Sequence, residues 1–182
     1  MRSARRLVFP ALILAVPALL FGRNRQISQI DEYCERVNAE LSSTKPLLFA
    51  GPDPWTEADD RETGDPPDVL AYVYTAGPQI RRVFLRVTDE DDGWREDIVY
   101  FFSPSGDLVK RIRTVLSPAA NISFEAAAYY KDGRLLKERS HHNALGRGKQ
   151  DVRHFIDPGA PIFWTSDDLP FAEQLDLWRG LT

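Results

Sequence analysis

The feature that most constrains the fold is a strand–turn–strand pattern that occurs twice within residues 98–139. The first copy spans residues 100–110 and the second spans residues 129–137. Each copy has aromatic residues, then a short polar run with one glycine, then a return segment with leucine and a base. Aromatic residues fit the half-buried surface of a sheet, and glycine adopts the positive φ that tight turns need. The pattern therefore predicts two β-hairpins.

A third, weaker copy lies upstream, in residues 72–83. The turn glycines of the three copies, Gly77, Gly106 and Gly133, are 29 and 27 residues apart. A regular spacing of this size is typical of a repeated supersecondary unit. A plain antiparallel meander recycles the same strand–turn–strand order, so both interpretations stay open. Either one predicts an antiparallel sheet.

The return segment of the first hairpin alternates in character. Leu108, Ile112 and Leu116 have one parity, while Arg111 and Arg113 have the other. A period of two directs one set of side chains toward a core and the other toward water. We therefore expect the leucine set on the core face and the arginine set on the outer face.

A different period precedes the strands. Ile27, Ile30, Cys34, Val37 and Leu41 are spaced by 3, 4, 3 and 4 residues, which draws one apolar stripe along a helix. The spacing predicts an amphipathic helix over residues 24–42, packed on the sheet. Cys34 lies on the stripe, so we expect a small buried apolar group rather than a nucleophile. It is the only cysteine, which excludes an intrachain disulfide.

The N-terminal segment has the form of an export signal. Arg2, Arg5 and Arg6 precede an apolar run over residues 7–21. The run is shorter than the roughly 20 residues that a spanning helix needs. We expect a signal peptide or N-terminal anchor over residues 1–22 and a single α+β domain over residues 23–182. The protein is then exported, periplasmic or secreted, or is membrane-anchored through residues 7–21 if they are not cleaved.

The remaining segments complete the predicted architecture. Residues 51–68 hold seven acids, one base and four prolines, which is typical of an acidic loop. Residues 140–150 are predicted to be a loop and residues 151–156 a last strand. Phe171, Leu175 and Trp178 stand at helical intervals and predict a short C-terminal helix. The fold class is α+β: an N-terminal amphipathic helix on a curved antiparallel meander that forms a partial barrel, closed by the C-terminal helix.

Composition and motifs narrow the function. The formal net charge of −4 argues against a general nucleic-acid binder. The chain has no Gly-x-Ser-x-Gly, no phosphate-binding glycine loop and no dinucleotide fingerprint, so no cofactor is predicted.

The three histidines, His141, His142 and His154, fall within fourteen positions, with Asp151 and Asp157 nearby. Two or three imidazoles and a carboxylate can hold zinc. Adjacent histidines on a strand point to opposite faces, however, and no His-Glu-x-x-His spacing is present. A hydrolase or metal-dependent enzyme seated near residues 141–154 is therefore the alternative hypothesis, and no metal is expected in the leading one.

The bases concentrate on the predicted strands and the acids in the loops. Arg111, Arg113, Arg134 and Arg139 are the candidate binding residues of a basic sheet face for an acidic protein or an anionic envelope polymer. The alternative is a solvated face whose bases pair across strands. The candidate acids for such pairs are Glu96, Asp97, Glu125 and Glu138.

The order of an export signal, the helix Ile-Asp-Glu-Tyr-Cys-Glu-Arg-Val-Asn at residues 30–38 and the hairpins resembles a loose group of small exported bacterial proteins with no established activity. The string Tyr-Tyr-Lys-Asp-Gly-Arg-Leu-Leu-Lys at residues 129–137 resembles the MORN-type and related antitoxin repeats. No functional residue carries over from either resemblance. The leading hypothesis is an exported, non-catalytic envelope module that binds a protein or polymer. It predicts no nucleic-acid partner and membrane contact only through the N-terminal segment.

Overall fold

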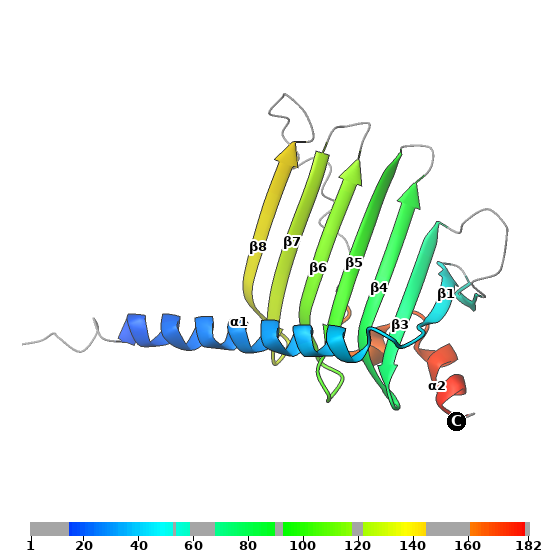
Figure 1. The fold of residues 1–182 in the computed structure, drawn as a ribbon, viewed down its shortest axis with the longest axis horizontal. Helices are drawn as coiled ribbons and strands as arrows, with labels where there is room; N and C mark the ends of the chain where they lie inside the picture. The colour runs from blue at the N-terminus through cyan, green and yellow to red at the C-terminus, as the bar shows by residue number, and fades with distance from the viewer. Residues whose placement is uncertain are drawn as a thin grey trace, which may run out of the picture.

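The computed structural model describes residues 15–52, 54–58, 68–89, 93–117, 122–144 and 161–180. These residues form one eight-stranded antiparallel sheet, a long N-terminal helix and a short C-terminal helix (Figure 1). The predicted α+β class and the antiparallel meander are confirmed. Within the described residues, no helix is long and apolar enough to cross a membrane.

The strands follow one another along the sheet in the order β2-β1-β3-β4-β5-β6-β7-β8. Their bounds are β1 Leu47–Gly51, β2 Thr56–Glu57, β3 Val69–Ala76, β4 Gln79–Asp89, β5 Trp94–Phe102, β6 Leu108–Ser117, β7 Ile122–Lys131 and β8 Arg134–Ala144. From β3 to β8 each strand pairs with the next one in the sequence. The short β2 lies inside the predicted acidic loop and pairs back on β1.

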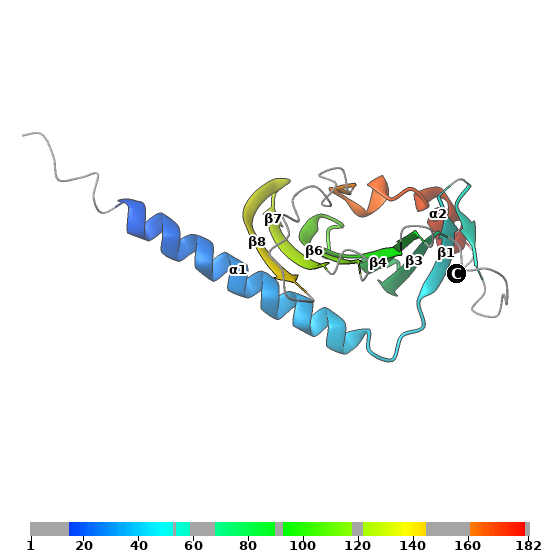
Figure 2. The ribbon, with the colours of Figure 1, turned by 90° about the horizontal axis from the view of Figure 1, so that it is seen from above.

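The helix α1, Ala15–Glu40, runs across the strands near their hairpin turns (Figure 1). It begins nine residues before the predicted start, because the end of the apolar run continues the helix. Cys34, Val37 and Leu41 are buried together with Phe101 of β5, as the apolar stripe predicts. Viewed from above, the first turns of α1 project beyond the β8 edge of the sheet (Figure 2).

The opposite face of the sheet is covered by the C-terminal segment (Figure 2). This segment contains a 3-10 turn, η2 (Ser166–Asp168), and the helix α2, Ala172–Gly180, which confirms the predicted C-terminal helix. Phe171 and Leu175 are fully buried in the main core, and the Phe171 ring stacks on Phe49 of β1 with centroids 5.0 Å apart. The sheet is therefore apolar on both faces, with α1 on one and the C-terminal segment on the other.

The three hairpins share a detail of geometry that their sequences hint at. Each has a register shift just before its turn, after Tyr74, Phe101 and Tyr129, so the shifts are 27 and 28 residues apart. In each case the extra residue lies on the return strand, and the glycine of the turn has a positive φ. The spacing of the glycines thus reflects a unit of structure that recurs three times.

The same unit explains why α1 lies across the strands. Its aromatic residue pairs with a base on the face under α1: Tyr74 with Arg82, Phe101 with Lys110 and Tyr129 with Lys137. Arg82 donates to Asn38 of α1 at 2.8 Å, and Lys110 donates to Asp31, seven residues earlier, at 2.5 Å. Seven helical residues rise about 10.5 Å, while two strands span roughly 9.6 Å. Two helical turns therefore match one hairpin.

The shift in the second hairpin overturns the predicted alternation of β6. Leu108 is buried in the core under the C-terminal segment, whereas Ile112 packs against the cluster under α1. The prediction that both residues share one face was wrong. Val109 is the extra residue between them, and one additional residue moves every later side chain to the other face.

The end of the meander also differs from expectation. β8 continues to Ala144, so His141 and His142 lie on a strand and not in the predicted loop. The strand is long because β7 offers a backbone partner as far as Ile122. Three predictions fall wholly or mainly outside the described residues: most of the segment 1–22, the centre of the acidic loop and the strand at 151–156.

Candidate functional site

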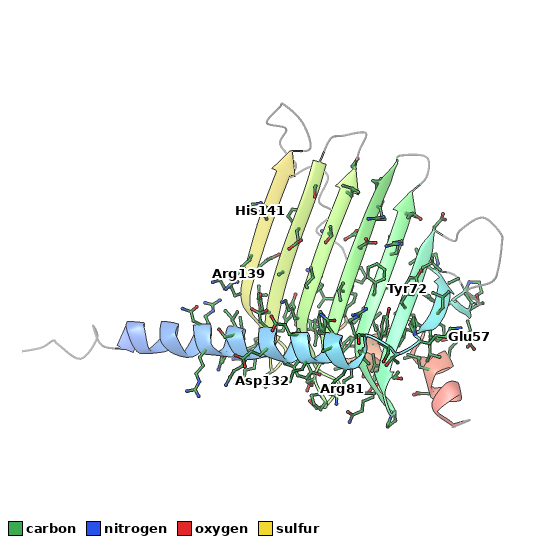
Figure 3. The ribbon with its side chains drawn as sticks, viewed as in Figure 1. Glu57, Tyr72, Arg81, Asp132, Arg139 and His141 are labelled. Atoms are coloured by element: carbon green, nitrogen blue, oxygen red, sulfur yellow. The ribbon has the colours of Figure 1, made fainter. Side chains whose placement is uncertain are left out.

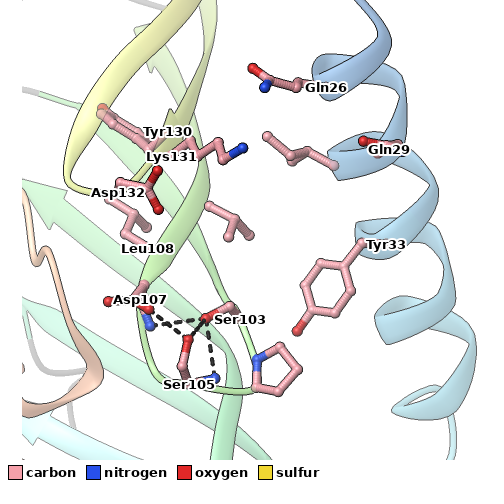
Figure 4. Close-up of a pocket in the computed structure, with 13 residues that line it drawn as sticks. Gln26, Gln29, Tyr33, Ser103, Ser105, Asp107, Leu108, Tyr130, Lys131 and Asp132 are labelled. Carbon is pink, nitrogen blue, oxygen red and sulfur yellow. Dashed lines mark hydrogen bonds between the residues drawn. The ribbon is translucent and has the colours of Figure 1, made fainter.

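A cavity of about 330 Å³ lies between α1 and the turns of the two best-marked hairpins (Figure 4). Its walls are α1 on one side, and the β5–β6 turn and the β7–β8 turn on the other. The lining residues are Gln26, Gln29, Ile30, Tyr33, Ser103, Pro104, Ser105, Asp107, Leu108, Val109, Tyr130, Lys131 and Asp132. Residues from three separate parts of the sequence therefore meet in one site.

The α1 wall follows from helical spacing. Gln26, Gln29, Ile30 and Tyr33 occupy positions i, i+3, i+4 and i+7 of the helix and so share one side of it. The Tyr33 hydroxyl donates to the Phe102 carbonyl oxygen at 2.5 Å and accepts from the Arg81 guanidinium at 3.2 Å. Burial raises the pKa of Tyr33 even though Arg81 opposes the shift. The phenol is thus neutral at physiological pH and held in place.

The β5–β6 turn is stiffened by its own polar side chains. Ser105 Oγ donates to Asp107 Oδ2 at 2.6 Å and lies 2.7 Å from Ser103 Oγ. The backbone N–H groups of Ser105 and Asp107 donate to Ser103 Oγ at 3.2 and 3.1 Å. These bonds fix the rim of the cavity on this side before any ligand arrives.

Other polar groups of the lining have no such role. The side chains of Gln26, Gln29, Lys131 and Asp132 make no hydrogen bond or ion pair with any other part of the chain that the structure describes. The Lys131 side chain extends across the opening toward α1 (Figure 4). The apolar lining below these groups comes from Ile30, Leu108, Val109 and Tyr130. An apolar floor with a few convergent polar groups is the usual form of a small-molecule site.

A polar cluster holds α1 to the sheet beside the cavity. Lys110 Nζ lies 2.5 Å from Asp31 Oδ1, and the Tyr129 hydroxyl donates to Asp31 Oδ2 at 3.3 Å. Burial is the largest influence and by itself would lower the pKa of Lys110, but the hydrogen bond to Asp31 and the charge interactions with Tyr129, Asp31 and Cys34 together outweigh it, so the pKa is raised. The lysine therefore stays charged and paired. Burial also raises the pKa of the neighbouring Cys34 thiol to about 12, so this thiol is not a nucleophile at neutral pH.

The four predicted binding arginines do not share one face. Arg111 and Arg113 pair across strands with Tyr100 and Ile98, which lie in the core under the C-terminal segment. Arg139 lies on the α1 face of β8, where its guanidinium is 5.6 Å from the Tyr129 ring centre, and Arg134 is exposed beside the β7–β8 turn (Figure 3). The register of the sheet thus separates Arg111 and Arg113 from Arg139.

Two of the four candidate acids form the cross-strand pairs that were the alternative to a basic binding face. Arg113 is 7% exposed and forms an ion pair with Glu96, which is 8% exposed. On the α1 face, Asp97 accepts from Arg86 at 2.9 Å and lies 3.3 Å from Arg95. Arg113 is consequently part of the interior.

The histidines are not gathered into a site by the described residues. His141 is exposed on β8, directly across from Glu125 of β7 (Figure 3). The structure describes the backbone but not the side chain of His142, and His154 lies outside the described residues. Among the residues that are described, no group of three or more histidine, cysteine, aspartate or glutamate side chains is placed to hold a metal ion.

Comparison with protein-family models, with curated proteins and with solved structures found no match for this chain. The resemblance to small exported proteins and to MORN-type repeats stays a prediction. Sequence reasoning singled out both hairpin turns but not the cavity that they line. The cavity could not be predicted because the apolar stripe of α1 does not show which turn of the helix packs against which hairpin.

Proposed function

We propose that the protein is an exported or membrane-anchored, non-catalytic binding module that takes a small ligand between α1 and the two hairpin turns. The observation that carries the proposal is the set of four polar side chains without partners among the described residues, Gln26, Gln29, Lys131 and Asp132, above an apolar floor. Such groups lose hydration when the cavity fills, so they favour a ligand that replaces their hydrogen bonds.

The chemistry of the lining favours an uncharged ligand. Lys131 and Asp132 carry opposite charges, so neither an anion nor a cation gains much from the pair. The third charged residue of the lining, Asp107, accepts a hydrogen bond from Ser105 of the same turn. The amides of Gln26 and Gln29 both donate and accept hydrogen bonds, which suits hydroxyl groups. A ring with hydroxyls on its edge and an apolar face matches this lining. We infer that one sugar ring of an envelope glycan is the ligand.

The fold supports this placement of the site. We propose that the meander is curved into a partial barrel that partly surrounds α1, with the cavity at its turn end. Register shifts bend strands and increase their twist, and all three lie at that end of the sheet. Export through the basic and apolar N-terminal segment would bring the cavity into contact with envelope glycans.

The cavity is tested by thermal unfolding of the full chain with a panel of neutral sugars, N-acetylated sugars and short peptides. A ligand at one hundred times its Kd stabilises the folded state by about 2.7 kcal/mol. For a domain of this size that free energy raises Tm by roughly 5–10 °C. The variant Gln29→Trp places an indole at the mouth of the cavity and should abolish the shift.

The matched control is Ser28→Trp, an equally exposed position on α1 that does not line the cavity. It should keep the full shift in Tm. An increase in Tm with peptides and not with sugars would show that the ligand of the cavity is a peptide rather than a glycan. An equal shift in Gln29→Trp and Ser28→Trp, or no shift with any compound, would contradict the proposal that this cavity binds a ligand.

A further inference from the structure

We propose that the β8 edge of the sheet and the adjoining turn of α1 rest on anionic lipid headgroups when the apolar N-terminal segment is in a membrane. The lipid-facing surface, as we call it, is made of Arg23 and Arg25 of α1 and of Arg134, Leu135, Lys137 and Arg139 of β8. The inference rests on the membrane-anchored form of the proposed function, but it is independent of the cavity, because none of these residues lines it.

The position of β8 along α1 follows from the cavity walls. Gln26 and Gln29 face Lys131 and Asp132 of the β7–β8 turn, so α1 passes the last hairpin at about residue 26. Toward its N-terminus the helix then leaves the sheet on the β8 side, as both ribbon views show (Figures 1 and 2). With a rise of 1.5 Å per residue, Arg25 and Arg23 lie within about 5 Å of this point along the axis.

The helical rise of 1.5 Å per residue also gives the distance from β8 to the apolar segment. The apolar run ends at residue 21, five residues before Gln26, which is about 7.5 Å along a helix. The backbone of α1 is continuous from Ala15 to Glu40, so its packed half and its apolar start belong to one helix. Electrostatic attraction acts over about 8 Å at physiological ionic strength. The β8 side chains are therefore within reach of the headgroups that surround an inserted apolar segment.

The charge of this surface has the sign that anionic lipids attract. It carries five bases, and the only acid on the same stretch of β8 is Glu138, in a chain whose formal net charge is −4. Arg23, Arg25, Arg134 and Lys137 have no ion-pair partner within the part of the chain that is described. Each base near an anionic membrane strengthens the association about fivefold.

Leu135 adds an apolar contact on the other face of the same edge strand. It is 52% exposed and one of three large hydrophobic residues that the described part of the chain leaves open to solvent. Leu135 pairs with Tyr130 and therefore lies on the C-terminal-segment face of this edge strand, while Lys137 and Arg139 lie on the α1 face. An edge strand laid on a membrane presents both faces to the boundary between headgroups and acyl chains, where apolar and basic side chains are both stabilised.

The test uses the full chain, synthesised in the presence of vesicles that contain a headgroup-linked fluorescence quencher. A fluorophore is attached at Ser140→Cys on β8 or, as the control, at Thr56→Cys on β2. Both sites are exposed, and burial with a raised thiol pKa keeps Cys34 slow to react. Seven strand spacings of about 4.8 Å place β2 roughly 34 Å from β8.

In vesicles with phosphatidylglycerol, the probe at residue 140 should be quenched and the probe at residue 56 should not. The double variant Arg134→Glu/Arg139→Glu should lower the ratio of docked to undocked protein about fivefold for each base removed. For the single variant Arg134→Glu, the matched control is Arg36→Glu, which carries the same charge change at an exposed position of α1 away from this surface and should leave the ratio unchanged.

Equal quenching in vesicles of phosphatidylcholine alone, or no quenching at residue 140 in either lipid, would overturn the proposal. The bases would then serve only to keep the open β8 edge from pairing with other chains, as charges on edge strands do. A cavity that binds no ligand would leave these results untouched, so the two proposals fail separately.

Discussion

Arg113 illustrates how the meaning of a single residue depends on its burial. An arginine at an alternating position of a strand is usually predicted to be a surface charge. Arg113 is instead almost fully buried beside Glu96. A buried charge requires its partner, because the free energy of removing each ion from water is large. Arg139, also on a strand, is exposed, and its guanidinium lies 5.6 Å from the Tyr129 ring centre.

We expect Arg113→Ala to lower the free energy of unfolding by about 3–5 kcal/mol, because the Glu96 carboxylate is left buried without its partner. The measurement is urea denaturation followed by circular dichroism. The double variant Glu96→Leu/Arg113→Met should recover most of the loss. Arg139→Ala is the control and should cost no more than about 0.5 kcal/mol. Equal losses for Arg113→Ala and Arg139→Ala would show that the pair does not stabilise the fold.

At the scale of elements, the hairpin is the unit that recurs. Each has a turn glycine with positive φ and an extra residue on the return strand. The β7–β8 turn also places Asp132 at a φ of 50°, so two successive residues adopt the left-handed conformation. That geometry matches the right-handed twist of the two strands, which explains why the Asp-Gly pair predicted this hairpin well.

Gly133→Ala should destabilise the protein by about 1–2 kcal/mol, since a Cβ disfavours the left-handed conformation by that amount. No other atom lies within 4 Å of the position where this Cβ would stand, so backbone strain is the sole cost. Gly133→Asn is the matched variant and should lose roughly half as much, because asparagine tolerates positive φ. Denaturant midpoints of the three proteins provide the comparison. Alanine and asparagine variants of equal stability would argue against a strained turn.

On the scale of the whole molecule, the sheet is closed on both faces by segments from the two ends of the described chain. α1 covers one face through Cys34, Val37 and Leu41. The C-terminal segment covers the other through Leu169, Phe171 and Leu175. An eight-stranded sheet with an apolar face on each side is stable in water only when both faces are covered. The folded state therefore depends on the apolar residues of the C-terminal segment as well as on those of α1.

Phe171→Ala should reduce the free energy of unfolding by about 3–5 kcal/mol, since it leaves a cavity beside Phe49 and Trp55. Ile162→Ala, in the same segment but 39% exposed, should cost less than about 1 kcal/mol. Calorimetric unfolding of both variants measures the difference. A small loss in Phe171→Ala would mean that the C-terminal segment does not seal the core.

Local sequence patterns are sufficient to identify most helices and strands of this fold. Period-two and period-3.6 patterns identified the strands from Val69 onward, the apolar stripe of α1 and the C-terminal helix, because these periods are properties of the backbone. Turn glycines located the hairpins for the same reason. The face of the sheet that each side chain occupies depends instead on how neighbouring strands pair. Val109, the extra residue of β6, places Leu108 and Ile112 on opposite faces of the sheet. The pattern within one strand does not show such a shift, because the shift arises from pairing with the neighbouring strand. The cavity was likewise decided by packing: it exists because two turns of α1 match the width of a hairpin, which brings Gln26 and Gln29 to Lys131 and Asp132 from more than 100 residues away.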